Sequence, residues 1–181
     1  RAWVPTTVAY TAYGFAYILV MAFLVARLKD DSGFSPSEAA LMFSLVGVAA
    51  AFGGVSLGAL SDRIGRRITL MGAFTMYASC GLLILTGKQP IVAIASLGIG
   101  LAFSGGPALI TGHIVAHTDS STYGPAFAAA TLSFGVAQMI SPQIGGLIAD
   151  VTGSFTMVFI LSATISMVGA AAASRLPRRG T

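Results

Sequence analysis

Charged residues are scarce in this sequence. Only 9% of its residues are Asp, Glu, Lys or Arg, whereas 55% are hydrophobic and the mean hydropathy is +0.85. Soluble domains carry charge on about a quarter of their residues. A chain this poor in charge cannot cover a surface that faces water. The composition therefore excludes a soluble globular domain and indicates a membrane protein.

Cysteine and histidine are also scarce, which removes several kinds of site. The single Cys80 has no partner for a disulfide or a cysteine-ligated metal. His113 and His117 have a spacing that suits a metal, but only Asp119 lies near enough in sequence to add a ligand. We therefore predict no metal and no cofactor, and we expect both histidines to be polar residues at a membrane interface. The sequence contains no nucleophile–base pair or phosphate loop, so we predict no enzyme.

The net charge of +4 does not indicate a nucleic-acid partner, because the ten basic residues form no single face. They lie between apolar segments and at the end of the chain. The first residue is Arg instead of Met, and no small-residue cleavage site follows the first apolar stretch. We therefore expect this stretch to be a true membrane span and the chain to be a fragment or a processed product.

The sequence contains six long stretches without charge. Each has about 20 residues, enough helix to cross a hydrocarbon core of about 30 Å. Strands of a membrane barrel would be about 10 residues long and would alternate in polarity. The predicted fold is an all-α integral membrane protein, with one bundle of six transmembrane helices over residues 1–181. The predicted spans are residues 3–27, 37–60, 68–87, 90–113, 122–149 and 154–174.

Two local patterns describe the second span in more detail. Ser35, Pro36 and Glu38 have the order of an N-cap, a first-turn proline and a capping-box acid, which predicts a helix start. Small residues then recur close to every fourth position, which predicts a smooth stripe for close helix packing. The stripe consists of Gly47, Ala51, Gly54 and Gly58.

The basic residues are divided unevenly between the two sides of the predicted bundle. By the positive-inside rule, the side with more Lys and Arg faces the cytoplasm. One side holds Arg1, Arg63, Arg66, Arg67, Arg175, Arg178 and Arg179, and the other holds Arg27, Lys29 and Lys88. We therefore predict a protein of the bacterial inner membrane with both termini in the cytoplasm.

The segment between the second and third spans carries the most specific pattern, G-A-L-S-D-R-I-G-R-R-I-T-L over residues 58–70. It resembles the loop signature of the major facilitator superfamily, G-x-L-(small)-D-R-x-G-R-R/K-x-x-L. The matching residues are Gly58, Leu60, Asp62, Arg63, Gly65, Arg66 and Arg67. The resemblance implies a conformational switch at the cytoplasmic boundary, with Asp62 as a latch. A local cap of the hairpin is the alternative.

The fifth span contains A-Q-M-I-S-P-Q-I-G-G over residues 137–146, which resembles a second signature of this superfamily, G-x-x-x-G-P-x-x-G-G. Pro142, Gly145 and Gly146 match, whereas Ala137 and Ser141 replace glycines. The tracts at residues 13–17, 58–67 and 148–155 are most similar to the YbfB/YjiJ-type group. The resemblance implies a transporter of two six-helix bundles, of which this chain is one, built from two inverted three-helix repeats.

Two features favour the C-terminal bundle of such a transporter. In the N-terminal half, the fourth helix often carries an arginine linked to proton coupling, but residues 97–106 contain no charge. The chain also ends soon after the sixth span, in the short basic tail Arg175–Thr181. Glu38 and Asp150 lie at helix ends, so no ionisable group is expected at mid-membrane. A coupling carboxylate would then lie in the other half.

The resemblance also places the first and fourth helices along a central substrate cavity. Tyr10, Tyr13 and Tyr17 share one face of the first helix, and phenols can stack on a solute and bond to it. An aromatic packing stripe is the alternative. Further cavity candidates are Ser104, Thr111 and Gln138, of which Gln138 could instead bridge two helices.

The prolines and glycines inside the spans are candidates for helix hinges. A proline removes one backbone hydrogen bond and permits a bend, which transporters tolerate where protein or water satisfies the freed group. The candidates are Gly105, Gly106 and Pro107 in the fourth helix and Pro142, Gly145 and Gly146 in the fifth. A static bend is the alternative.

The predicted function is secondary active transport of a small molecule by alternating access. The expected partners are the small-molecule substrate, the lipid bilayer and a second six-helix bundle, which is either the missing N-terminal half or a homodimer mate. The alternative is a stand-alone membrane module that homodimerises or acts as a scaffold without transporting.

Overall fold

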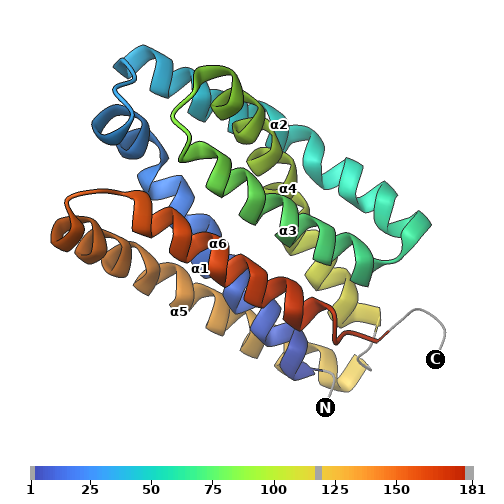
Figure 1. The fold of residues 1–181 in the computed structure, drawn as a ribbon. Helices are drawn as coiled ribbons and strands as arrows, with labels where there is room; N and C mark the ends of the chain where they lie inside the picture. Colours follow the sequence, from blue (N-terminus) through green and yellow to red (C-terminus); the bar gives the residue numbers. More distant parts are fainter. Residues whose placement is uncertain (1–2, 117–119, 178–181) are drawn as a thin grey trace.

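The computed structural model describes residues 3–116 and 120–177, which form six long helices and one π-helical turn (Figure 1). All six helices are long and apolar enough to cross a membrane. This confirms the predicted all-α membrane fold. The elements are α1 (Trp3–Ala26), η1 (Arg27–Asp31), α2 (Pro36–Ile64), α3 (Arg66–Ile84), α4 (Gln89–Ala116), α5 (Ser120–Thr152) and α6 (Thr156–Ala173).

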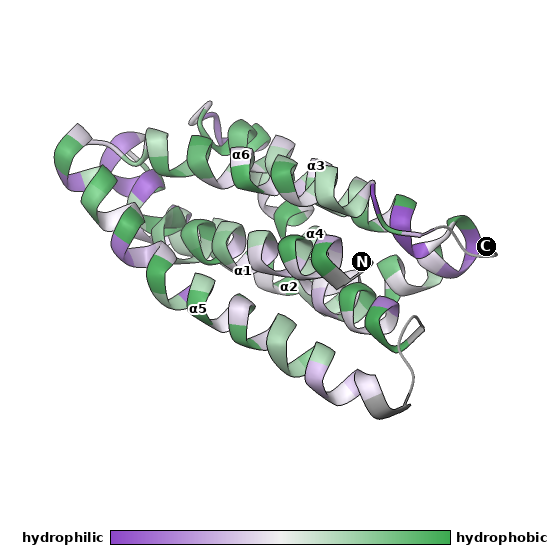
Figure 2. Cartoon of the chain, turned by 90° about the horizontal axis from the view of Figure 1, so that it is seen from below, coloured by the Kyte–Doolittle hydropathy of each residue, from purple (hydrophilic) through white to green (hydrophobic). Residues whose placement is uncertain are grey.

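The central helices α1 and α4 have equivalent sets of neighbours. α1 packs on α5 and α6, and α4 packs on α2 and α3. α3 and α6 also pack on each other, and Figure 2 shows them as a layer on one side of α1 and α4. Each central helix therefore contacts the second and third helices of the other half of the chain. This exchanged packing fits the two predicted three-helix repeats.

The closest helix contact in the bundle joins α2 to α4 and depends on two glycines. A Cβ atom on Gly53 would lie 2.3 Å from the carbonyl oxygen of Leu101, and one on Gly100 would lie 2.2 Å from that of Val46. These separations are too short for any side chain, so the two backbones can approach only because both residues are glycine.

Most of the small-residue stripe predicted on the second helix does not make this contact. A Cβ atom on Gly47 or Gly58 would have no neighbour within 4 Å, and Ala51 is exposed. Gly54 does face α4, where a Cβ atom would lie 3.8 Å from the Ser104 carbonyl oxygen. The prediction of close packing is therefore wrong within this bundle for three of the four residues, and Gly54 makes an ordinary contact.

The start of α2 agrees with the sequence, but its end does not. Ser35 is the N-cap: its Oγ accepts from the Glu38 N–H at 3.3 Å, and its own N–H donates to Glu38 Oε2 at 2.8 Å. The predicted span ends at residue 60, whereas α2 continues to Ile64. Polar residues in the last turn do not break a helix, and the first residue that leaves it is Gly65.

The outer helices α2 and α5 leave large apolar side chains uncovered. Phe52 and Val55 on α2 are 64% and 78% exposed, and Leu132 and Met139 on α5 are 70% and 64% exposed. Monomeric soluble proteins rarely expose so much apolar surface. These two helices therefore require lipid or another protein against them.

Candidate functional site

Aromatic rings from three helices meet on one side of α1. The Tyr10 ring stacks on Phe134 of α5 with centroids 4.4 Å apart, and the Tyr17 ring lies 4.9 Å from Phe103 of α4. Tyr13 lies between them, 5.2 Å from Tyr17. We call these five residues the aromatic cluster. The sequence analysis missed Phe103 and Phe134, because only the tertiary fold brings them to the tyrosines.

The members of the aromatic cluster differ in their access to the surroundings. Tyr10 and Tyr13 are only 6% and 7% exposed, whereas Tyr17, Phe103 and Phe134 are half-buried. A solute that reaches this surface would therefore meet Tyr17 before Tyr10 or Tyr13.

Gln138 extends the aromatic cluster with an amide group. Its Nε2 donates a hydrogen bond to the phenol oxygen of Tyr17, so two candidate residues 121 positions apart are direct partners. Gln138 is half-buried. The amide thus bridges α5 and α1, as the alternative interpretation expected, while it lies beside the accessible part of the aromatic cluster.

The two other cavity candidates lie elsewhere on α4. Ser104 faces α2, where its Oγ would be 2.4 Å from a Cβ atom on Gly53. Thr111 is half-buried, eight positions beyond Phe103. The structure therefore does not bring Ser104 or Thr111 into the aromatic cluster.

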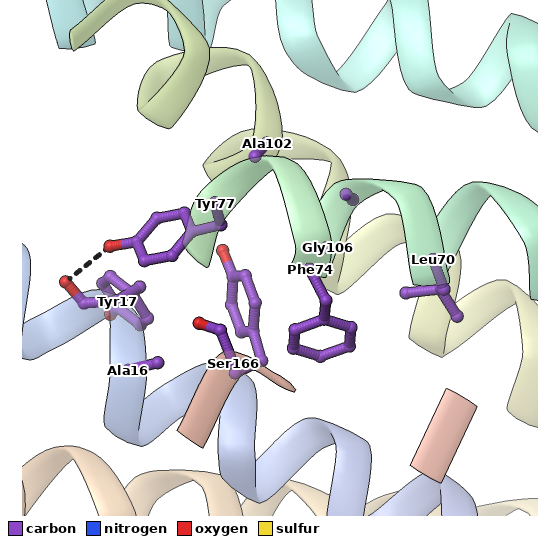
Figure 3. Close-up of a pocket in the computed structure, with 10 residues that line it drawn as sticks. Ala16, Tyr17, Leu70, Phe74, Tyr77, Ala102, Gly106 and Ser166 are labelled. Carbon is purple, nitrogen blue, oxygen red and sulfur yellow. Dashed lines mark hydrogen bonds between the residues drawn. The ribbon is translucent and has the colours of Figure 1, made fainter. Parts of the chain in front are cut away.

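A small cavity inside the bundle lies behind Tyr13 and Tyr17, among α1, α3, α4 and α6 (Figure 3). Its volume is about 10 Å³, which is room for one water molecule and too little for a solute. Tyr77 of α3 lines it and donates to the carbonyl oxygen of Tyr17 at 3.2 Å. This cavity belongs to the internal packing of the bundle.

The predicted hinge residues of α4 lie where two other helices press against it. A Cβ atom on Gly105 would be 2.4 Å from Cδ1 of Leu57 on α2, and one on Gly106 would be 2.4 Å from Cε2 of Tyr13 on α1. Pro107 follows inside the same continuous helix. The two glycines therefore make room for Leu57 and Tyr13, directly before the proline, which has no N–H group to donate.

The predicted hinge residues of α5 differ in how closely α1 approaches them. Gly145 lies beneath α1, where a Cβ atom would be 2.5 Å from the Phe23 ring, whereas Gly146 has open space at that position. Pro142 lies inside α5, which is helical from Ser120 to Thr152. A hinge at these residues stays a prediction.

The predicted switch segment is a helix–glycine–helix junction instead of a loop. Asp62 and Arg63 lie in the last turn of α2 and are exposed, and α3 begins at Arg66. Only Gly65 leaves the helical conformation, with φ of +90°, which side chains rarely adopt. This geometry gives a physical reason for the second glycine of the signature.

The two arginines after this glycine bind the ends of other helices. Arg66 Nη1 donates to the Gly112 carbonyl in the last part of α4 at 2.7 Å, and Arg67 Nη1 donates to the Leu176 carbonyl after α6 at 3.3 Å. Cations are favourable near helix C-termini, where the helix dipole carries its negative end. Arg66 and Arg67 therefore tie the α2–α3 junction to α4 and α6.

The structure describes one of the two histidines. His113, beside Gly112, is 3% exposed and therefore packs inside the bundle near the end of α4, and its place at a membrane interface stays a prediction. Arg66 of α3, which donates to the carbonyl of the preceding residue Gly112, lies against this part of α4. His117 and Asp119 lie outside the described residues.

A polar network that the sequence analysis missed lies at the opposite end of the bundle. Arg27 is 6% exposed and pairs with Asp31 at 3.5 Å, and its Nη2 donates to the Leu85 carbonyl after α3 at 3.2 Å. Asp31 Oδ2 accepts from the Phe155 N–H and the Ser154 hydroxyl before α6, both at 2.8 Å. The i,i+4 spacing of Arg27 and Asp31 is the signal that could have revealed the pair.

Six helices able to cross a membrane, together with a cationic junction bound to helix ends, make the described part of this chain a bundle of the multi-pass membrane type. The family model described as "Uncharacterised MFS-type transporter YbfB" matches residues 1–174. The chain belongs to this family of the major facilitator superfamily. The match confirms the resemblance found in residues 58–70 and 137–146.

Curated relatives of this chain are transporters rather than enzymes. The probable sulfoacetate transporter SauU of Cupriavidus necator is 27% identical over 95% of this chain and 42% of its own length. The sialic acid transporter NanX of Escherichia coli is 26% identical over 83% of this chain and 37% of its own length. The chain thus spans less than half the length of these relatives.

Proposed function

We propose that this chain forms one half of a secondary transporter that moves a small molecule across the bacterial inner membrane by alternating access. The observation that carries the proposal is the match of a transporter family model to all six helices, residues 1–174. In this mechanism a six-helix bundle rocks against a second bundle around a site at mid-membrane. The substrate site is then open first to one side of the membrane and then to the other. Both termini of this chain are proposed to lie in the cytoplasm.

The second bundle is proposed to cover the uncovered faces of this one. The matched transporters are more than twice as long as the part that aligns with this chain, which supports a further bundle of similar size. The exposed apolar side chains of α2 and α5 supply surfaces for it. The absence of charge in residues 97–106 favours the C-terminal position for the present bundle.

The substrate is proposed to contact the accessible part of the aromatic cluster and Gln138. This wall offers aromatic faces, a phenol and an amide, but no charge. Such a wall suits a neutral or weakly polar solute. Two relatives are named for sulfoacetate and sialic acid, which are acids. If the substrate is an organic acid, its charge is recognised by the other half.

Asp62 is proposed to be a latch that holds the cytoplasmic side closed. It lies in the last turn of α2, beside Arg63 and one turn from Arg66. Asp62 and Arg63 are exposed, at the end of α2 that lies on the side with the excess of basic residues. This position supports a role for Asp62 at the cytoplasmic face.

The test is transport by the full-length protein in proteoliposomes, with a panel of neutral solutes and organic acids that includes sulfoacetate and sialic acid. We expect saturable counterflow of at least one member, abolished when the vesicles lack protein. Binding of a panel member without any movement across the membrane would favour the alternative of a non-transporting module. A dimer of this chain alone, found by mass determination in detergent, would favour a homodimeric arrangement.

A further inference from the structure

We propose that the hydroxyl of Tyr13 replaces the backbone donor that Pro107 removes from α4, so that Tyr13 is the positioning residue for α4 at this proline. Pro107 has no N–H group, and in an α-helix the N–H of residue 107 would bond to the carbonyl of residue 103. Pro107 therefore leaves the carbonyl of Phe103 without its helical donor. A carbonyl without a donor is costly inside a membrane, where no water replaces the bond.

Tyr13 supplies a donor to this same carbonyl. Its phenol Oη donates to the carbonyl oxygen of Phe103, across the contact between α1 and α4. The phenol is almost fully buried, since Tyr13 is 7% exposed. The hydroxyl therefore satisfies the one carbonyl of α4 that the proline deprives of a partner.

Gly106 leaves the space that the Tyr13 ring occupies. A Cβ atom on residue 106 would lie 2.4 Å from Cε2 and 2.8 Å from Cδ2 of that ring. Any side chain at this position would push the ring away from α4. Gly106 and Pro107 thus act together: the glycine admits the ring and the proline leaves the carbonyl that the ring's hydroxyl reaches.

Tyr77 makes a comparable bond that lacks this feature. Its hydroxyl also donates to a carbonyl of another helix, that of Tyr17, at 3.2 Å. The helical donor to that carbonyl is the N–H of Met21, which is present inside α1. Loss of the Tyr77 hydroxyl leaves no carbonyl deprived of its donor, so Tyr77 is a matched control within the same bundle.

The inference concerns bonding within the bundle, so it stands or falls separately from the proposed transport. The first experiment is a double-mutant cycle on unfolding of the full-length protein in lipid or mild detergent. We expect Tyr13→Phe to raise the unfolding equilibrium constant roughly 3- to 20-fold, the range measured for hydrogen bonds between transmembrane helices. In a Pro107→Ala background, where residue 107 regains its N–H, the same change should have an effect below about 2-fold.

Tyr77→Phe provides the comparison. Its effect should be the same in the native and the Pro107→Ala backgrounds. An equal effect of Tyr13→Phe in both backgrounds would overturn the proposal, because the hydroxyl would then not replace the missing donor.

A second measurement tests the positioning role and needs no unfolding. Spin labels at Ile94 and Val115, which are 68% and 55% exposed on either side of Pro107, report how the two parts of α4 are oriented in a Cys80→Ser background. Tyr13→Phe should broaden or shift the distance distribution in the native background and leave it unchanged with Pro107→Ala. An unchanged distribution in the native background would show that Tyr13 does not position α4 at Pro107.

Discussion

Gln138 on α5 donates a hydrogen bond to the phenol oxygen of Tyr17 on α1, across 121 residues of sequence. This one hydrogen bond joins the two side chains, and both are half-buried at the edge of the aromatic cluster. The pair is therefore held in a defined geometry while part of it stays within reach of a solute. Such pre-organised polar groups in an apolar surface are typical of small-molecule sites.

Replacement of Gln138 by Leu should raise the KM for transport about 5- to 10-fold and change kcat little. The amide is expected to contribute about one hydrogen bond to the bound solute, and a net bond of about 1–1.4 kcal/mol corresponds to this factor. Gln143→Leu, on an exposed part of the same helix, is the control. A reduced amount of folded protein with an unchanged KM would show that Gln138 only bridges the helices.

Asp62→Asn should slow turnover and enlarge the population with an open cytoplasmic side, while substrate affinity stays close to normal. The substitution keeps the shape of the side chain and removes a charge that strengthens hydrogen bonds by about a factor of two. A latch present in one state alone shifts the equilibrium between the states. Interspin distances across this face provide the measurement, and Asp30→Asn at the opposite end is the control. Weaker substrate binding with unchanged distances would contradict the latch.

A cysteine at Lys88 should react with an impermeant reagent added outside intact cells, whereas one at Arg175 should not. The prediction follows from the excess of basic residues on the side of Arg175. Both positions are exposed and lie just outside helices, Lys88 before α4 and Arg175 after α6, and Cys80→Ser removes the only other thiol of the chain. Gly65 is unsuitable as a labelling site because its φ is +90°. Reaction at 175 alone would reverse the proposed orientation.

Arg27→Met should lower the free energy of unfolding by about 3 kcal/mol, because it leaves the Asp31 carboxylate without its cation and the Leu85 carbonyl without its donor. Lys29→Met, two residues away and exposed, should change it by less than about 0.5 kcal/mol. Unfolding in denaturing detergent measures both. Equal effects would mean that the Arg27 network contributes nothing beyond an ordinary surface charge.

Gly53→Ala should destabilise the bundle by about 1–3 kcal/mol, because the new methyl group would lie 2.3 Å from the Leu101 carbonyl oxygen. Gly47→Ala should be neutral or slightly stabilising, since its methyl group meets no atom of this bundle and alanine favours a helix. Thermal unfolding of the two variants compares them directly. If Gly47→Ala were more destabilising than Gly53→Ala, Gly53 would not be the residue that allows the α2–α4 contact.

The parts of the structure that depend on neighbouring residues in sequence could be predicted. The six spans follow from the long uncharged stretches, and the start of α2 follows from the order of Ser35, Pro36 and Glu38. Both are local: a span depends on its own hydropathy, and a capping box closes within one helical turn.

The parts that depend on helix pairing could not be predicted. Small residues occur on two sides of α2, and only contact with α4 shows that Gly53 packs while Gly47 does not. The switch segment contains charge and glycine, which suggested a loop, yet a helix tolerates both until Gly65. The partners Tyr13 and Phe103 are 90 residues apart, so no local pattern connects them.

Arginines tie helix ends together on both sides of this bundle. On one side Arg66 binds the Gly112 carbonyl of α4, and on the other Arg27 of η1 binds the Leu85 carbonyl after α3. Between these two contacts, α4 lacks the backbone hydrogen bond that Pro107 cannot donate, and a hydroxyl of α1 takes its place. A force that separates α1 from α4 would therefore also remove a bond on which α4 depends. The packing of these two helices and the internal bonding of α4 should be lost together.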